Sequence, residues 1–346
     1  MLDKLRSLLK ELGLPRTIIV SFLSILVILA GIYGIPLPAL LSDLLVRVGM
    51  NGIFVLAMLP AIVSGIGPNF GLPLGILGGI VGALLAIEWN LTGLTAIIVA
   101  IVTGLPLAVL IGMAYGWLLN KVKGSEMMVS TYVGFSFVSL MNIAWILLPF
   151  KSAAMRWPIG RGLRVTIALE GRYDQVLNKI LEFKIGGLTI PTGLLLVFLL
   201  LCLLVWLFMR SKTGIAMKAV GDSRQFAVAS GLSVDKNRIL GTVLSTALGA
   251  IGIVVFSQSY GFLQLYEAPM FMGFAAVASI LIGGATVRKA GISNVIIGAI
   301  LLQGLLVIAL PVANKIITVG GVAEITRIIV SNGIILYALA QVGGGD

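Results

Sequence analysis

The chain has 346 residues, of which 59% are apolar and only 11% are charged. Soluble domains average about 45–50% apolar and about 25% charged residues, so this composition excludes a soluble globular protein. The net charge of +11 is the excess of Lys and Arg expected in cytoplasmic loops of membrane proteins, and we do not interpret it as nucleic-acid binding. With no histidine and one cysteine, Cys202, we expect no metal site, no cofactor and no internal disulfide.

Long apolar stretches predict ten membrane-spanning helices, because about 20 residues in a helix cross a bilayer. In chain order we expect these spans at 17–33, 49–67, 70–88, 92–119, 127–148, 190–209, 239–258, 268–284, 291–311 and 322–341. The expected fold class is therefore an all-α polytopic membrane protein, with residues 1–346 forming a single transmembrane domain.

The distribution of Lys and Arg predicts the orientation, because short cytoplasmic loops carry more of them. Basic residues near the N-terminus, at 121–123 and at 288–289 place both termini in the cytoplasm. The loop at 149–189 then lies outside although it holds seven Lys or Arg, against six in the loop at 210–238. These two loops by themselves leave the opposite orientation open.

Two glycine-rich segments interrupt the helical pattern. Residues 65–75 contain two prolines and four glycines, and residues 283–291 form a similar break in the second half. Irregular backbone at membrane depth is tolerated only where protein or a water-filled cavity satisfies its polar groups. Paired breaks in two halves are typical of transporters with inverted repeats, so we expect broken helices and, as a hypothesis, such a repeat.

The loop at 210–238 contains the pattern of a short helix. With Asp222 as the N-cap, Gln225 occupies the third helical position of a capping box. Gly231 can end the helix in a left-handed conformation, which gives it about eight residues. A helix this short is unstable alone in water, so something must pack against it. That contact is either the rest of this chain or a soluble partner.

Four segments carry a family resemblance: Ile190-Pro191, Arg210-x-x-Thr213-Gly214, Ala219-Val220-Gly221-Asp222, and Ala229-Ser230-Gly231-Leu232-Ser233-Val234. Together they resemble the permease subunit of bacterial ATP-binding-cassette importers. The branch is that of the ribose/simple-sugar and nucleoside permeases, which are related to the branched-chain amino acid permeases. The resemblance implies that 210–238 is a cytoplasmic coupling loop docking onto a separate ATPase subunit. The residues it assigns to this contact are Thr213, Gly214, Gly221, Asp222, Ser223, Arg224, Gln225, Ala227 and Gly231.

The resemblance also implies the activity and the partners. The chain would be a non-catalytic permease of the bacterial inner membrane that imports a small neutral solute, a simple sugar such as ribose, with nucleosides and branched-chain amino acids as alternatives. Its partners would be the ATPase, a second permease subunit (identical or related) and an extracytoplasmic substrate-binding protein. The outer loop 149–189 includes an expected amphipathic helix at 174–183, which either lies on the membrane surface or receives the binding protein.

Uncharged residues inside the spans are candidates for the path of a neutral solute. They are Asn69, Phe70, Ser136, Asn142, Gln258 and Gln303. Each polar one could instead bridge helices by hydrogen bonds. An ion-coupled transporter would need ionisable groups at mid-membrane, whereas Glu88, Glu126 and Glu267 fall at the solvated ends of spans, so that class is less favoured. An intramembrane enzyme is excluded, because the chain has neither a Ser/His pair nor paired carboxylates on one helix face.

Overall fold

The computed structural model describes residues 14–316 and residues 325, 328–329, 332–333 and 336. Nine of the ten predicted spans coincide with helices in this part of the chain. These are α2 (Leu14–Ile32), α3 (Leu37–Val63), α4 (Leu72–Glu88), α5 (Gly93–Lys121), α6 (Glu126–Leu147), α8 (Thr192–Arg210), α11 (Val234–Tyr260), α12 (Met272–Ile282), preceded by the 3-10 turn η1 (Ala268–Phe271), and α13 (Ile292–Ile316). The tenth predicted span, 322–341, falls largely outside the described residues.

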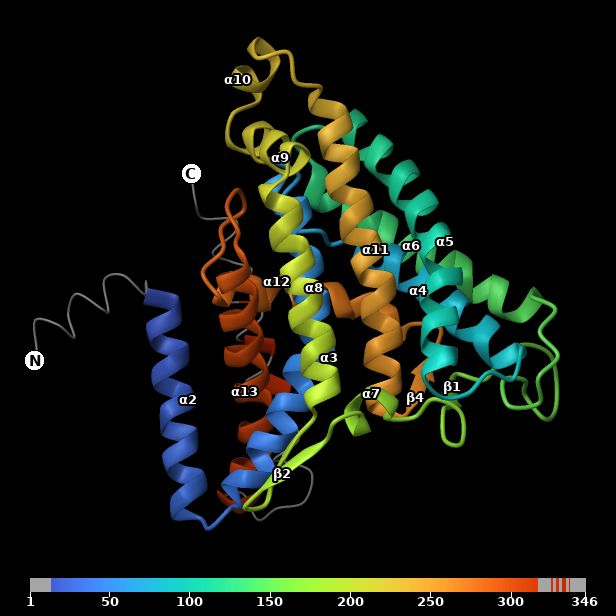
Figure 1. Cartoon of the computed structure of the whole chain (residues 1–346), viewed down its shortest axis with the longest axis vertical. Coiled ribbons are helices and arrows are strands. Elements are labelled where there is room, and N and C mark those ends of the chain that lie inside the picture. The colour runs from blue at the N-terminus through green and yellow to red at the C-terminus, as the bar shows by residue number, and fades with distance from the viewer. Residues whose placement is uncertain (1–13, 317–324, 326–327, 330–331, 334–335, 337–346) are drawn as a thin grey trace, which may run out of the picture.

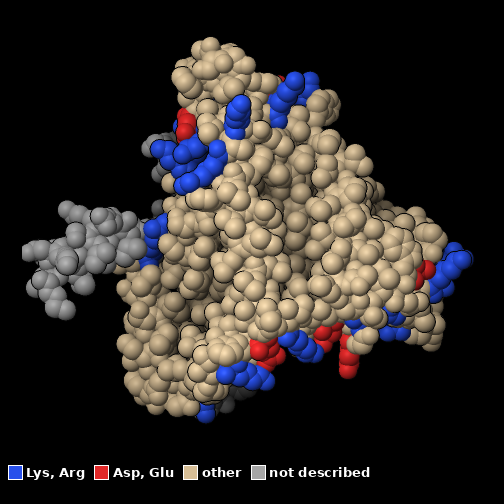
Figure 2. Space-filling model, in the orientation of Figure 1, with Lys and Arg blue, Asp and Glu red and all other residues tan. Residues whose placement is uncertain are grey.

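Six of the described helices, α3, α5, α6, α8, α11 and α13, are long and apolar enough to cross a membrane. Shorter apolar helices cover Arg16–Ile32, Leu72–Glu88 and Ala268–Ile282. Figure 2 shows a broad belt of uncharged surface, with most charged side chains gathered at the two ends of the molecule. A belt of this kind fits the hydrocarbon layer of a bilayer, so the chain is a multi-pass membrane protein.

The centre of the bundle consists of α3, α4, α5 and α11, which pack closely because α4 is rich in glycine. A Cβ atom at Gly75 would lie 2.2 Å from the carbonyl oxygen of Thr246 on α11, and one at Gly82 would lie 2.0 Å from that of Ala100 on α5. Small residues allow helix backbones to approach this closely in a membrane. In contrast, only 17% of the apolar window of α6 and 22% of that of α8 are buried within the chain.

Residues 64–71 and 283–291 form non-helical breaks after α3 and after α12. The two breaks lie at the same end of the bundle, because a Cβ atom at Gly67 would lie 3.4 Å from Cγ1 of Val287. Arg16 of α2 donates a hydrogen bond to the carbonyl oxygen of Gly283 in the second break. An inverted repeat that related these two segments would place them at opposite ends, so the geometry gives no support to that relation.

At the opposite end of the molecule the described chain forms four three-residue strands, which the all-α prediction did not include; the rest of the described fold is mostly helical, as predicted. Strand β1 (Thr166–Ala168) pairs antiparallel with β4 (Phe262–Gln264), with Ile167 opposite Leu263. Strand β2 (Phe183–Ile185) pairs antiparallel with β3 (Leu188–Ile190). The β1–β4 pairing attaches the 149–189 loop to the chain that follows α11 (Figure 1), whereas β2 and β3 form a local hairpin before α8.

The amphipathic helix predicted at 174–183 is also wrong. Only α7 (Val176–Lys179) is helical in this stretch. Gln175 and Leu181 adopt positive φ angles of 51° and 53°, a left-handed conformation that interrupts a right-handed helix on both sides. The apolar residues that suggested the helix do not share one buried face, because Leu177 is buried whereas Leu181 and Phe183 are exposed.

Candidate functional site

The 210–238 loop folds into two short helices, α9 (Lys212–Asp222) and α10 (Arg224–Ala229), at one end of the bundle (Figure 1). The one short helix predicted in this loop corresponds to α10, but Asp222 is not its N-cap: Asp222 ends α9, a helix that was not predicted. Ser223 is the cap, and its Oγ accepts a hydrogen bond from the Phe226 N–H at 3.3 Å. The backbone explains the difference. Ser223 is extended, with φ −155°, so it separates α9 from α10, and α10 begins one residue later than predicted.

The end of α10 follows the prediction. Gly231 is left-handed with φ 74°. The Gly231 N–H donates to the Val228 carbonyl at 3.0 Å, and the Leu232 N–H donates to the Ala227 carbonyl at 2.9 Å. This is the double hydrogen bond of a Schellman motif. Ala227 is buried in a small apolar cluster with Val220, Leu232 and Val234, so α10 is held by the chain on one side.

The other side of α10 is not covered by the described residues. Phe226 is 62% exposed and Val228 is 61% exposed. Arg224 and Gln225, both predicted coupling residues, are exposed beside them. Two large apolar side chains presented to water on a six-residue helix form a patch typical of a protein contact.

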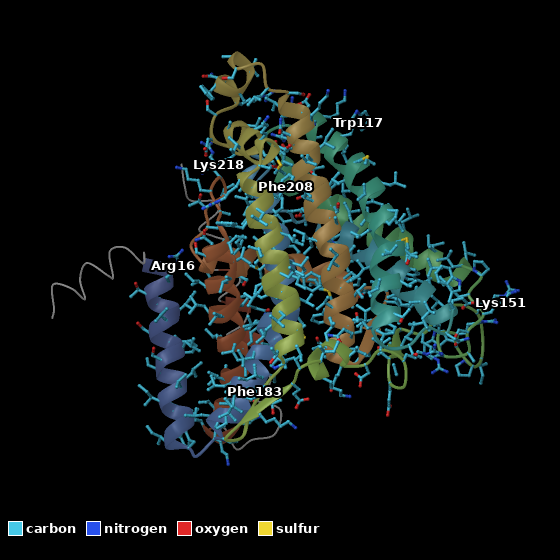
Figure 3. The ribbon with its side chains drawn as sticks, in the orientation of Figure 1. Arg16, Trp117, Lys151, Phe183, Phe208 and Lys218 are labelled. Atoms are coloured by element: carbon cyan, nitrogen blue, oxygen red, sulfur yellow. The ribbon has the colours of Figure 1, made fainter. Side chains whose placement is uncertain are left out.

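Helix α9 rests directly on the first break. A Cβ atom at Gly221 would lie 2.1 Å from the carbonyl oxygen of Val63, and one at Gly65 would lie 3.0 Å from Cα of Gly221. Only glycine permits this backbone contact. Gly214 is similarly restricted, because a Cβ atom added there would lie 2.3 Å from the Phe208 carbonyl oxygen at the end of α8. The predicted coupling residue Thr213 is exposed. Figure 3 labels Lys218 on α9 and Phe208 near the end of α8.

An ion pair that the sequence did not predict joins the start of α11 to the start of α6, beside the same break. Arg238 Nη2 lies 2.6 Å from Glu126 Oε1, with side chains only 7% and 14% exposed. Arg238 also donates to Asn120 Oδ1 at 3.0 Å and to the Gly65 carbonyl at 3.4 Å. Glu126 was expected to be solvated at a span end. It is paired instead, because α11 brings in Arg238 from 112 residues away, a contact that no local pattern reveals.

Two of the predicted path residues serve as bridges between elements. Asn69 is buried; it donates to Ser245 Oγ at 2.7 Å and accepts hydrogen bonds from the Tyr115 hydroxyl and the Gly71 N–H, both at 2.9 Å. Gln258 is buried at the end of α11, where its Oε1 accepts a hydrogen bond from the Leu177 N–H at 3.0 Å. In both side chains these hydrogen bonds occupy the amide oxygen.

The other four predicted path residues lie in three places. The Phe70 ring is 5.4 Å from that of Phe274, which is 6.1 Å from Phe135 on α6. Ser136 follows Phe135 and is exposed. Asn142 lies further along α6, and its buried Oδ1 has no hydrogen-bond partner among the described residues. Gln303 is buried in α13, apart from the others. Among the described residues no group of three or more His, Cys, Asp or Glu could hold a metal ion.

Comparison with known proteins identifies the type of chain. The family described as "Branched-chain amino acid transport system / permease component" matches residues 40–339. The chain belongs to this permease family. The resemblance predicted from the sequence is confirmed, and the matched range of this permease contains both breaks, α9, α10 and the Arg238–Glu126 pair.

A relative in the same class is the nucleoside ABC transporter permease protein NupB of Lactococcus lactis subsp. cremoris (strain MG1363). It is 24% identical over 193 residues, a match that covers 52% of this permease and 50% of the relative. The permease thus matches about half the length of this curated relative. No solved structure matches the chain.

Proposed function

We propose that this permease is the membrane subunit of an ATP-driven importer, and that the 210–238 loop is its coupling loop on the cytoplasmic side. The observation that carries the proposal is the backbone contact of Gly221 with Val63 and Gly65. Through this contact, a force applied to α9 reaches the first membrane break without an intervening flexible side chain. ATP hydrolysis would take place in a separate ATPase, so the permease itself would be non-catalytic.

The path of the force follows from the packing. An ATPase covering Phe226 and Val228 would hold α10 from the cytoplasm. Buried Ala227 joins α10 to α9 and α11. Arg238 on α11 then reaches the Gly65 carbonyl, so the loop touches the first break at two points. We infer that ATP-driven movement of α10 shifts this break and thereby opens or closes the solute path.

The remaining architecture is proposed on the same basis. The 149–189 loop would lie outside and receive a substrate-binding protein, and both termini would lie in the cytoplasm of a bacterial inner membrane. A second permease subunit, identical or related, would complete the path. The weakly buried helix α6, with exposed Ser136, and the aromatic group around Phe274 offer a face for that purpose.

For the solute we propose a nucleoside. The similarity to a nucleoside permease supports it. So does the aromatic group of Phe70, Phe135, Phe271 and Phe274, since Phe271 is 65% exposed and aromatic rings stack with bases. The scarcity of charge inside the spans fits a neutral solute. A simple sugar such as ribose and a branched-chain amino acid are the competing candidates.

Uptake competition tests the solute. In cells that express the permease with its neighbouring transport genes, unlabelled nucleosides should suppress uptake of labelled uridine, whereas equal concentrations of ribose or leucine should leave it unchanged. An uncoupler applied at constant cellular ATP should have little effect, because no ion gradient drives the step. Suppression by ribose alone would transfer the assignment to a simple sugar. Loss of uptake with the gradient would favour a secondary transporter.

Replacing Phe226 and Val228 together by serine should abolish most ATPase binding while leaving the permease folded. The physical reason is that both side chains are already exposed and contribute little to internal packing, whereas a buried aromatic contact at an interface is typically worth about 2 kcal/mol or more. Co-purification of the ATPase with the tagged permease measures the effect. The matched control is Phe183→Ser, which removes a ring that is 55% exposed at the opposite end. Equal loss of ATPase in both variants would contradict the proposed docking surface.

A further inference from the structure

A cavity of about 860 Å³ lies between α3, the end of α8, α9 and the second break. Four basic side chains from three separate segments line it, together with one carboxylate, that of Asp222. The basic residues are Arg210, Lys218, Arg288 and Lys289. Figure 2 shows Lys and Arg gathered near the α9 end of the molecule, and Figure 3 labels Lys218 there.

The positive charge of this cavity is not neutralised within the described chain. None of the four cations forms an ion pair with a described residue, since the ion pairs there involve Lys123, Lys184 and Arg238. Asp222 offsets one charge of the four. Like charges gathered around one opening repel one another and attract an anion.

Part of this charge is held on a defined turn. The Thr286 N–H donates to the Lys289 carbonyl at 2.8 Å, and Thr286 Oγ1 accepts hydrogen bonds from the N–H groups of Lys289 at 3.0 Å and Arg288 at 3.4 Å. The N-terminus of α13 also reaches the cavity at Ile292, and helix N-termini attract anions. Arg288 and Lys289 are thus fixed beside the first residues of α13.

The lining also has an apolar part, which adjoins the lipid-facing surface. Leu59, Val63, Met209 and Trp206 line the same cavity. The Arg210 guanidinium lies over the Trp206 ring, 3.8 Å from its centroid. Next to Trp206 on α8, Leu207 is 51% exposed. A tryptophan and basic residues at the end of an exposed apolar helix are typical of the headgroup level of a bilayer.

We propose that this cavity binds a phosphate-bearing group, the headgroup of an anionic phospholipid whose chains lie along α8. Basic pockets between membrane helices are suited to such headgroups. The site joins α8 and α9 to the second break, so a bound headgroup would hold these elements together. The inference depends on the membrane character of the chain and not on the identity of the solute.

Native mass spectrometry of the full permease in neutral detergent, titrated with phosphatidylglycerol or phosphatidylcholine, tests the site. The wild type should retain phosphatidylglycerol in preference to phosphatidylcholine. Arg288→Ala/Lys289→Ala should weaken phosphatidylglycerol binding roughly 30-fold, since each basic residue near an anionic lipid contributes about fivefold. Both side chains are exposed, so the variant should keep the wild-type melting temperature in the absence of added lipid.

The control variant Lys121→Ala/Lys236→Ala removes the same charge from exposed positions that do not line the cavity, and it should change binding less than twofold. Millimolar inorganic phosphate provides the other arm. If phosphate does not displace the lipid, the headgroup with its chains is the ligand; if it does, the site accepts a free phosphate group as well. Equal binding of the two lipids, or equal weakening in both variants, would overturn the proposal.

Discussion

Replacing Arg238 by alanine should cause the largest loss of stability of any single substitution at the coupling end. The substitution leaves Glu126, only 14% exposed, without its cation, and it removes hydrogen bonds to Asn120 and to the Gly65 carbonyl. Removing one partner of a buried ion pair typically costs about 3–5 kcal/mol. We expect a lower melting temperature in detergent, measured by tryptophan fluorescence, and a loss of solute uptake.

The neighbouring Lys123–Asp235 pair is the matched control. Its atoms lie 3.2 Å apart, but the side chains are 33% and 59% exposed. Exposed pairs contribute about 0–1 kcal/mol, so Lys123→Ala should leave the melting temperature nearly unchanged. The double variant Arg238→Gln/Glu126→Gln should lose less stability than Arg238→Ala, because no uncompensated charge stays buried. Equal effects of Arg238→Ala and Lys123→Ala on the melting temperature would show that the buried pair contributes no more to stability than the exposed one.

Gly221→Ala should uncouple ATP hydrolysis from transport. The added methyl group would lie 2.1 Å from the Val63 carbonyl oxygen, and a backbone atom cannot rotate away as a side chain can. Relief requires α9 to move off the first break. Overpacking of this kind costs about 1–3 kcal/mol, so the ratio of α9 seated on the break to α9 displaced from it should fall roughly tenfold, and uptake should fall with it. Hydrolysis by the assembled ATPase should continue, because α10 keeps its exposed surface.

Gly31→Ala controls for the added methyl group itself. Gly31 lies in α2, and an added Cβ there meets nothing within 4 Å. A helical Gly→Ala change in open space should be neutral or should stabilise by up to about 1 kcal/mol. Uptake and hydrolysis are then measured together for both variants in reconstituted vesicles. If Gly221→Ala retained normal uptake, the contact between α9 and the break would not transmit motion.

Most helices, and the short helix in the 210–238 loop, were predictable from the sequence because both depend on local patterns. Apolar length located nine helices, although α3 begins at Leu37, twelve residues before its predicted start at 49. Glycine chemistry located the end of α10 at Gly231. The start of α10 was misplaced by one residue, because Asp222 and Ser223 are both good caps and the choice between them depends on where α9 ends.

The candidate path residues were less predictable. Buried amides such as Asn69 and Gln258 look alike in sequence whether they line a path or bridge helices. Their hydrogen bonds to Tyr115 and to the Leu177 N–H became visible only with the neighbouring elements in place. The short strands at the other end escaped prediction for a similar reason: β1 and β4 pair across about a hundred residues, and three-residue strands carry too little periodicity to identify.

The sequence by itself determined that the chain is a membrane protein, where most of its helices lie and where the short helix before Gly231 ends. These properties follow from composition and from residues close together in the chain. Only the tertiary structure decided that Gly221 touches the first break, that Arg238 is paired with Glu126, and that four cations surround one cavity. Such contacts join residues far apart in the chain, and their energies depend on distance and burial, which no local pattern encodes.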